Sequence, residues 1–271
     1  MASHVKKTIV VTGSASGIGA SVRRIFELEG MKVIGIDLRD AEIIVDLSHG
    51  EGRNQAIAEA IKLSGGVING VVTSAGVGPP CDPKKMIAIN WLGTVELLAG
   101  FREVLSSSES NSHVVAVSSN STTITPNVPD ELIEACLKFD EEKAFTVLEN
   151  YTGMAAMAIA YAASKTAVAR FVRQTAPTAE WAGSGIRLNA IAPGAILTPL
   201  LQGGLNDQEF GDAIRALPVP VGEFGSPEVI ARWIEMMMSD AANFMCGSVV
   251  VVDGGSDALI RPDDWPKSFT I

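Results

Sequence analysis

Short runs of apolar, often β-branched residues recur along the chain, and most are apolar at nearly every position instead of alternating with polar residues. Such continuous runs are typical of strands that a parallel sheet buries on both faces. The pattern predicts strands at Thr8–Thr12, Met31–Ile36, Glu42–Val45, Gly70–Thr73, His113–Val117, Arg187–Ile191 and Ser248–Val252.

Longer stretches with helical periodicity, several of them rich in alanine, separate these runs. Helices are predicted at Gly17–Glu29, Gly52–Lys62, Met86–Leu105, Met154–Thr178 and Pro227–Met238. Strands that alternate with helices predict an α/β protein with a Rossmann-type, doubly wound parallel sheet. No polar linker rich in Pro and Gly divides the 271 residues, so we expect a single domain.

Charge and composition exclude several classes of partner. The chain has 21 Lys and Arg against 31 Asp and Glu, a net charge of −10, which disfavours nucleic acid and anionic membranes as partners. Its longest apolar run, Met154 to Ala163, is shorter than the ~20 residues that a spanning helix needs. Cys81, Cys136 and Cys246 are few and far apart, which favours a reducing compartment and no metal site. The amino-terminal residues lack a signal-peptide pattern, so we expect a cytoplasmic protein.

A glycine-rich turn follows the first predicted strand. Its residues are Thr12-Gly13-Ser14-Ala15-Ser16-Gly17-Ile18-Gly19, and a helix begins near Gly17. Glycine permits the positive φ of a tight turn and lets a pyrophosphate approach the amino end of a helix. The turn indicates a dinucleotide site, although an ordinary strand-to-helix turn has the same glycine content.

Asp37, at the end of the second strand, indicates which dinucleotide is bound. A carboxylate there accepts hydrogen bonds from both adenosine ribose hydroxyls and repels a 2′-phosphate. We therefore expect NAD as the cofactor. Arg39 is the counterargument, because an arginine near this position can accommodate the phosphate of NADP.

Several motifs along the chain resemble the short-chain dehydrogenase/reductase family. They are the glycine turn, Thr73-Ser74-Ala75-Gly76, Asn90 in Ile89-Asn90-Trp91-Leu92-Gly93, Ser118-Ser119, Tyr161-Ala162-Ala163-Ser164-Lys165, Asn189 to Gly194, and Val252-Asp253-Gly254-Gly255. The motif beginning at Thr73 departs from the family's Asn-Asn-Ala-Gly at its first two positions. The resemblance extends over essentially the whole chain, since the motifs occur in the family's order.

Tyr161 and Lys165 lie four positions apart on a predicted helix, so both side chains lie on one face. A cationic lysine beside a phenol stabilises phenolate and lowers its pKa from about 10. The resemblance implies that Tyr161 is the catalytic acid/base and that Ser119, rather than Ser118, hydrogen-bonds the substrate oxygen. It also implies that Asn90 holds Lys165 in a water-mediated proton relay.

The resemblance further implies a set of cofactor contacts. They come from the glycine turn, the carboxyl ends of later strands, the adenine-contacting pair and the loop beneath the nicotinamide. The residues are Gly13, Ser16, Gly17, Ile18, Gly19, Asp37, Asp46, Leu47, Ala75, Gly76, Tyr161, Lys165, Pro193, Gly194, Ile196 and Thr198.

Two departures from the usual family pattern narrow the resemblance. Too few positions separate Asp37 from Asp46 for the helix that members usually have there, so a short loop is expected beside the adenine. Extra residues, Asn120 to about Gly153, precede the catalytic helix. Both features resemble bacterial members that act on 3α-hydroxysteroids, with coniferyl-alcohol dehydrogenases as the nearest alternative.

The inserted residues have a helical, amphipathic pattern, and two interpretations remain open. The insertion at about 120–153 either roofs the substrate pocket or alters a subunit contact, because the catalytic helix is commonly an interface helix in this family. Residues of about 195–222, with paired glycines beside leucines, are expected to form a mobile apolar lid.

Taken together, the sequence predicts an NAD-dependent oxidoreductase that interconverts a secondary alcohol and a ketone. The expected substrate is small and apolar, either a 3α-hydroxysteroid with its 3-oxosteroid or an aromatic alcohol, and the expected assembly is a homodimer or homotetramer. A dinucleotide-binding regulator without turnover is the alternative from another class, which the retained Asn90, Ser119, Tyr161 and Lys165 disfavour.

Overall fold

A computed structural model describes residues 6–107 and 111–264. Its centre is a seven-stranded sheet with the order β3-β2-β1-β4-β5-β6-β7, and every neighbouring pair is parallel. The strands are β1 (Thr8–Thr12), β2 (Lys32–Asp37), β3 (Ile43–Ile44), β4 (Gly70–Thr73), β5 (Ser112–Val117), β6 (Ile186–Pro193) and β7 (Val249–Val252). The predicted doubly wound parallel sheet is confirmed.

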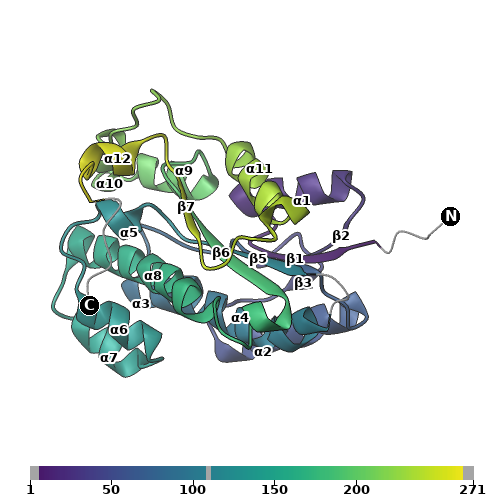
Figure 1. Ribbon diagram of the computed structural model, residues 1–271. Coiled ribbons are helices and arrows are strands. Elements are labelled where there is room, and N and C mark those ends of the chain that lie inside the picture. Colours follow the sequence, from purple (N-terminus) through teal and green to yellow (C-terminus); the bar gives the residue numbers. More distant parts are fainter. Residues whose placement is uncertain (1–5, 108–110, 265–271) are drawn as a thin grey trace.

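Helices cover both faces of this sheet (Figure 1). One layer contains α1 (Gly17–Leu28) and α11 (Pro227–Met237), and the other contains α2 (Gly50–Ser64), α4 (Gly93–Ser106) and α8 (Gly153–Thr175). Ile9 and Val11 of β1 belong to the core beneath α1 and α11, whereas Val10 belongs to the core on the other face. The absence of alternation in the strand sequences therefore reflects burial on both sides.

The strand order reverses between β1 and β4, which creates a switch point at the carboxyl edge of the sheet. From β1 the chain first builds outward to β2 and β3, and then returns to add β4 to β7 on the other side. Loops that leave adjacent strands in opposite directions open a crevice between them. The glycine turn follows β1 at this point.

One predicted helix is wrong in detail. The continuous helix expected over Met86–Leu105 is divided into α3 (Pro83–Met86), a π-helix (Ile87–Leu92) and α4. Asp82 caps α3 by accepting a hydrogen bond from the backbone N–H of Lys85 at 2.9 Å. A π-turn adds a residue without altering composition, so apolar periodicity does not detect it, and such turns occur frequently at functional sites.

The connection between β2 and β3 is short, as expected. No helix lies between them in the described chain, and Glu42 organises the turn. The Glu42 carboxylate accepts a hydrogen bond from the backbone N–H of Gly35 at 2.7 Å and from the Arg23 guanidinium at 2.6 Å. This side of the switch point is therefore closed by a loop tied to α1.

The insertion forms three short helices, α5 (Ser121–Ile124), α6 (Asp130–Leu137) and α7 (Glu141–Leu148). The buried side chains of Leu132, Cys136 and Leu148 join α6 and α7 to the main core. Figure 1 shows α6 and α7 on the side of α8 opposite to α9 (Pro199–Asn206) and α10 (Phe210–Arg215), which belong to the expected lid. This position of α6 and α7 does not suit a roof over the lid side of the cleft.

The remaining elements are short: α12 (Ser256–Ile260) and 3₁₀ turns at Ala182–Ser184 and Asp240–Ala242. None of the described helices is long and apolar enough to cross a membrane. Within residues 6–107 and 111–264, no group of three or more His, Cys, Asp or Glu side chains is arranged to hold a metal ion.

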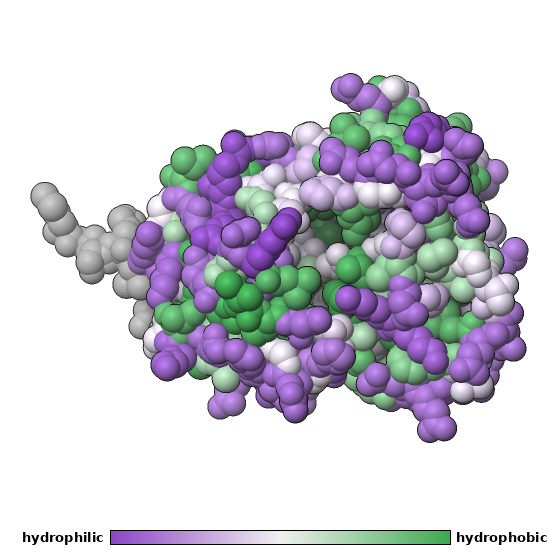
Figure 2. Space-filling view, turned by 180° about the vertical axis from the view of Figure 1, so that it is seen from behind, coloured by the Kyte–Doolittle hydropathy of each residue, from purple (hydrophilic) through white to green (hydrophobic). Residues whose placement is uncertain are grey.

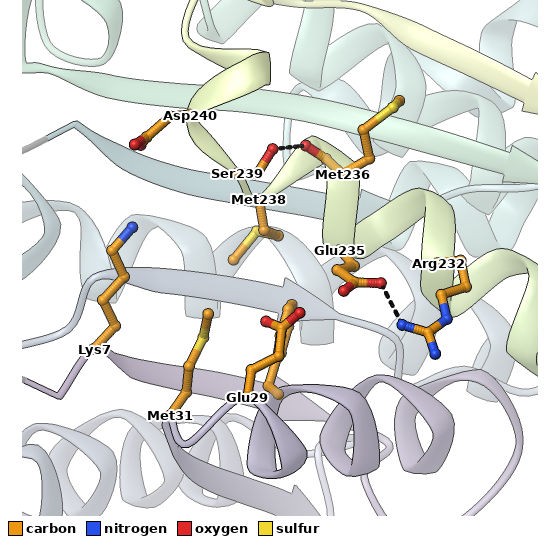
Figure 3. Close-up of a pocket in the computed structure, with 10 residues that line it drawn as sticks. Lys7, Glu29, Met31, Arg232, Glu235, Met236, Met238, Ser239 and Asp240 are labelled. Atoms are coloured by element: carbon orange, nitrogen blue, oxygen red, sulfur yellow. Dashed lines mark hydrogen bonds and ion pairs between the residues drawn. The ribbon is translucent and has the colours of Figure 1, made fainter.

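A hollow of about 410 Å³ lies between the amino ends of β1 and β2 and the end of α11 (Figure 3). Glu29, which follows α1, and Glu235 of α11 face each other across it. Their carboxyl groups share a hydrogen bond, which together with partial burial raises the pKa of Glu29 to about 7. The hollow is at the edge of the sheet opposite to the glycine turn.

We predict that Glu29→Gln stabilises the protein above pH 7 and has little effect near pH 5. A carboxyl group whose pKa is higher in the folded state stabilises the fold at low pH, and that contribution is lost as pH rises through about 7. The amide of glutamine keeps a donor toward Glu235 at every pH. We expect the Tm at pH 8 to rise by about 1–2 °C, a small value because both groups face solvent.

The matched control is Glu223→Gln, which removes the same charge from an exposed position. Differential scanning fluorimetry of both variants across pH 5–9 measures the effect. Equal Tm shifts for the two variants would show that net charge, and not the carboxyl pair, determines the pH dependence.

Candidate active site

The glycine turn has the backbone geometry that the sequence predicts. Gly13 has φ +67° and Gly17 has φ +54°. A Cβ at Gly13 would lie 2.8 Å from the backbone nitrogen of Ala75, and one at Gly19 would collide with the carbonyl oxygen of Gly13. The turn thus leads directly into the amino end of α1, with Ser16 and Ile18 on either side of Gly17, where backbone N–H groups and the helix dipole favour an anion.

Asp37 lies beside this turn. One carboxylate oxygen accepts a hydrogen bond from the backbone N–H of Ala15 at 2.9 Å, and the other accepts one from Leu38 at 2.7 Å. Arg39 is largely exposed, and its Nε lies 3.9 Å from an Asp40 carboxylate oxygen. Asp37 therefore places a carboxylate at the end of β2, whereas the Arg39 guanidinium lies nearer to Asp40 in the exposed loop.

The predicted adenine pair lies in the loop after β3. Asp46 accepts a hydrogen bond from the backbone N–H of Ser48 at 2.8 Å, which lowers the pKa of its carboxyl group. Leu47 is buried, and its carbonyl accepts a hydrogen bond from Arg53 at 3.1 Å. Ala75 and Gly76 follow β4 on the other side of β1, and the Ala75 N–H donates to the Thr12 hydroxyl at 2.9 Å.

Tyr161, Ser119 and Lys165 meet where α8 crosses the end of β5. The Tyr161 hydroxyl hydrogen-bonds the Ser119 hydroxyl, which also accepts a hydrogen bond from the backbone N–H of Ser121 at 3.1 Å. Lys165 is buried, and its Nζ donates to the carbonyl of Val117 at 2.9 Å. Ser118 instead donates to the backbone carbonyl of Lys165 at 2.9 Å, so Ser119 is the serine that faces Tyr161.

The electrostatics of this group differ from the expectation that Lys165 lowers the pKa of Tyr161. Burial raises the pKa of Tyr161 above its ordinary value, and the hydrogen bond from Ser119 offsets this only in part. Burial also lowers the pKa of Lys165 to about 8. Removal from water disfavours both charged forms, phenolate and ammonium, so the protein alone does not activate Tyr161 as a base.

Asn90 is fully buried in the π-helix. Its side-chain oxygen accepts a hydrogen bond from the Val77 N–H at 2.8 Å, and its amide nitrogen donates to the Val77 carbonyl at 2.9 Å and to the Ser164 hydroxyl at 3.2 Å. A Cβ at Gly76 would lie 3.1 Å from the Asn90 oxygen and 3.4 Å from Lys165 Nζ. Asn90 thus lies in the same group as Lys165, but its amide holds the backbone after β4 and the catalytic helix.

The loop from Pro193 to Thr198 closes the crevice from the β6 side. Gly194 donates its N–H to the Val252 carbonyl at 3.0 Å, and a Cβ there would lie 2.7 Å from the Cα of Asp253. Ile196 is buried. The Thr198 hydroxyl caps α9 by accepting a hydrogen bond from the Leu201 N–H at 3.3 Å, and its methyl group faces Gly17.

Sequence reasoning missed several residues that organise the site. Ser164 joins Asn90 to the Tyr161 backbone, and Asp253 accepts hydrogen bonds from Asn120 at 3.3 Å and from the Asp257 N–H at 2.7 Å. Gly78 lies between Leu200 and Tyr161: a Cβ at this position would lie 3.2 Å from the Leu200 side chain and 3.4 Å from the Tyr161 ring. Of these residues, Ser164 lies inside the Tyr-to-Lys spacing and Asp253 inside the Val252-Asp253-Gly254-Gly255 motif, whereas Gly78 carried no sequence signal.

Helix α9, which belongs to the expected lid, therefore lies close to Tyr161, because Leu200 of α9 and the Tyr161 ring both lie beside Gly78. Leu200 is 40% exposed, so it has an apolar surface that other molecules can contact. Figure 2 shows the rear face of the molecule, where a hollow near the centre is bordered by both hydrophobic and hydrophilic side chains.

The structure combines a parallel sheet, a glycine turn at its switch point, and a group of Tyr, Lys, Ser and Asn side chains beside that turn. Together these features define a Rossmann-type oxidoreductase.

Comparison with known proteins supports this class. A family model described as enoyl-(acyl carrier protein) reductase matches residues 143–257. The chain is 39% identical over 258 residues to 3-alpha-hydroxysteroid dehydrogenase/carbonyl reductase of Comamonas testosteroni, with 95% of this chain and 99% of the relative covered. It belongs to the short-chain dehydrogenase/reductase family.

Two further relatives are informative. The crystal structure of 3-alpha-hydroxysteroid dehydrogenase from Pseudomonas sp. B-0831, complexed with NADH, has a TM-score of 0.90 and 38% identity, with 96% of this chain and 100% of that chain covered. Coniferyl-alcohol dehydrogenase of Pseudomonas sp. (strain HR199 / DSM 7063) is 29% identical over 265 residues, with 92% of this chain and 96% of the relative covered.

We predict that Gly194→Ala lowers the free energy of unfolding by about 1–3 kcal/mol, because its Cβ would overlap Asp253. Gly203→Ala in α9 is the matched control, since a Cβ there meets no atom within 4 Å and alanine favours the helix. Urea unfolding of both variants measures the difference. Equal stabilities would contradict the close approach between the Pro193–Thr198 loop and β7.

Proposed function

We propose that this chain is an NAD-dependent dehydrogenase that interconverts a secondary alcohol and a ketone on an apolar, steroid-like substrate, with 3α-hydroxysteroids and 3-oxosteroids as the pair. The observation that carries the proposal is the hydrogen bond of Tyr161 to Ser119, one helical turn from the buried Lys165, beside the crevice at the switch point. The 39% identity to a hydroxysteroid dehydrogenase supports the substrate class.

The crevice fits a dinucleotide. Gly13 and Gly17 take the positive φ that turns the chain into the amino end of α1, where a pyrophosphate is favoured, and Gly194 lets the loop after β6 approach Asp253. Asp37 accepts a hydrogen bond from a ribose hydroxyl and repels a 2′-phosphate. We propose that NAD is held by Gly13, Ser16, Gly17, Ile18, Gly19, Asp37, Asp46, Leu47, Ala75, Gly76, Tyr161, Lys165, Pro193, Gly194, Ile196 and Thr198. When bound, NAD supplies a nicotinamide that exchanges hydride with the carbinol carbon.

The four proposed catalytic residues divide the remaining work. Tyr161 takes the hydroxyl proton in oxidation and returns it in reduction, while Ser119 hydrogen-bonds the same oxygen and stabilises its developing charge. Lys165 provides a positive charge near the phenol when protonated, which opposes the effect of burial on the pKa of Tyr161. Asn90 completes the proton relay to Lys165 through water.

The proposed substrate surface is apolar. Leu200 lies near the Tyr161 ring, and α9 and α10 form the lid proposed over about 195–222. Coniferyl-type aromatic alcohols are the alternative substrates, supported by the 29% identical relative but less strongly than steroids. A regulator without turnover would not require the hydrogen bond between Tyr161 and Ser119, which favours an enzyme.

We also propose that the protein is a homo-oligomer in the cytoplasm. In the described chain β7 pairs only with β6, so the outer edge of β7 is open. Val229, Trp233 and Met236 form an exposed apolar stripe on α11, with 48%, 39% and 43% of their surfaces exposed. A second copy that pairs along β7 and α11 covers both features, while α6 and α7 cover the outer side of α8.

The thiols of Cys81, Cys136 and Cys246 are free, which suits a reducing compartment.

We predict that the purified protein reduces NAD⁺ in the presence of androsterone-type 3α-hydroxysteroids. Tyr161→Phe is expected to lower kcat at least about 100-fold, because it removes the hydroxyl proposed to take the proton. Absorbance of the reduced nicotinamide measures the rate. Tyr151→Phe is the matched control, since it removes the chain's other phenol hydroxyl outside the site and is expected to keep full activity.

Three outcomes would contradict parts of this proposal. Faster turnover of coniferyl alcohol than of any 3α-hydroxysteroid would favour the aromatic alternative. A preference for NADP⁺ would show that Arg39, and not Asp37, determines cofactor choice. Full activity in Tyr161→Phe would remove the acid/base role of Tyr161.

A separate prediction concerns assembly. Trp233→Glu places a charge in the centre of the proposed interface and is expected to shift the protein toward monomer in sedimentation velocity at micromolar concentration. Leu38→Glu, at an exposed position away from α11 and β7, is the control. An unchanged sedimentation coefficient in Trp233→Glu would exclude this face as the interface.

A further inference from the structure

The insertion contacts the π-helix that carries Asn90. Trp91, the residue after Asn90, is 1% exposed, and its ring lies 5.6 Å from Phe139 and 5.9 Å from Phe171, measured between ring centroids. Phe139 comes from the turn between α6 and α7, whereas Phe171 comes from α8, the helix of Tyr161 and Lys165. The Trp91 ring is therefore held between the insertion and the catalytic helix.

No hydrogen bond holds Trp91 in this position. Its indole N–H is buried and has no hydrogen-bond partner among the described residues. A buried donor without a partner destabilises the folded state. Because polar interactions do not fix the indole, its orientation depends on aromatic packing against Phe139 and Phe171.

Phe139 is an unfavourable residue for its backbone position. It has φ +57°, in the left-handed region where glycine or asparagine usually follows a helix. Its N–H donates to the Cys136 carbonyl at 2.8 Å, which ends α6, and the next residue, Asp140, caps α7 by accepting from the Lys143 N–H at 3.0 Å. Its ring is 52% exposed, so burial alone does not account for a phenylalanine here. Contact with Trp91 is what this side chain provides.

A second set of contacts joins the insertion to the same region. Lys84 of α3 places its Nζ 5.1 Å from the centre of the Phe145 ring and 3.6 Å from a Glu149 carboxylate oxygen. Both partners belong to α7 or follow it directly. The insertion thus contacts the chain immediately before the π-helix through Lys84 and within it through Trp91.

We propose that the insertion positions Asn90, with Phe139 as the positioning residue that acts through Trp91. Fixing the Trp91 ring fixes the π-turn, and the π-turn directs the Asn90 amide onto Val77 and Ser164. Asn90 then stays in register with Lys165 and Tyr161 on α8. This assigns to the insertion a role in the active site that neither a roof nor a subunit contact requires, and it rests on the proposed function of Asn90.

The test is Phe139→Gly, which separates a positioning role from a structural one. Glycine relieves the positive φ, which offsets part of the stability lost with the ring, so a residue with only a structural role would leave kcat of the folded variant unchanged. Positioning predicts that kcat for the NAD⁺-dependent steroid oxidation falls about tenfold, because small misplacements of catalytic groups are costly. The KM for NAD⁺ is expected to stay within twofold. In the pH profile of kcat, the limb that reports ionisation of the proposed acid/base, Tyr161, is expected to shift.

Asn127→Gly is the matched control, because Asn127 has the same φ of +57° in the same insertion but does not contact Trp91 through a ring. It is expected to keep wild-type kcat. Phe139→Tyr keeps the ring with its hydroxyl toward solvent, and is expected to restore kcat. Trp91→Leu is expected to lower kcat similarly, and the double variant Phe139→Gly with Trp91→Leu is expected to be no slower than Trp91→Leu alone.

A folded Phe139→Gly variant with kcat and pH profile like the wild type would overturn the proposal, as would additive losses in the double variant. Should Phe139→Gly fail to fold, Phe139→Tyr and Phe139→Leu decide the matter, since only the first is expected to keep kcat. An inactive wild-type protein would instead refute the proposed function, so the two failures are distinguishable.

Discussion

The site depends on a buried cation. Lys165 lies in the core between α8 and β5, with its ammonium donating to the Val117 carbonyl at 2.9 Å and its backbone carbonyl accepting from Ser118 at 2.9 Å. These bonds fix α8 against the end of β5, so Tyr161, one turn earlier, meets Ser119. Burial is also what lowers the pKa of Lys165 to about 8 and raises that of Tyr161.

Short approaches between backbone segments place the other parts of the site around this cation. Gly13 lies against Ala75 and Gly194 against Asp253, in both cases closer than a side chain would allow, and Gly17 lies against the Thr198 side chain. The ends of β1, β4, β6 and β7 therefore converge on one crevice. The insertion and the segment proposed as a lid lie on opposite sides of α8, so one helix connects the proposed positioning of Asn90 with the apolar surface at Leu200.

Much of the fold was predictable, because continuous apolar runs report burial on both faces and because Tyr161, Lys165, Asp37 and the glycines recur at family spacings. The π-turn at Asn90 was not, since it adds one residue without changing the pattern. The aromatic contact of Phe139 with Trp91 joins positions far apart in sequence. The direction of the Tyr161 pKa shift was not predictable either, because it depends on burial outweighing the hydrogen bond with Ser119.

The central claim is that Tyr161 is the acid/base and that it becomes acidic only when positive charge is added beside it. The chain has two tyrosines, so in Tyr151→Phe the near-ultraviolet absorbance of tyrosinate reports Tyr161 alone. A pH titration is expected to give a pKa above the ordinary value of about 10 in the free protein, and one well below it with saturating NAD⁺. A titration that NAD⁺ leaves unchanged would contradict the account.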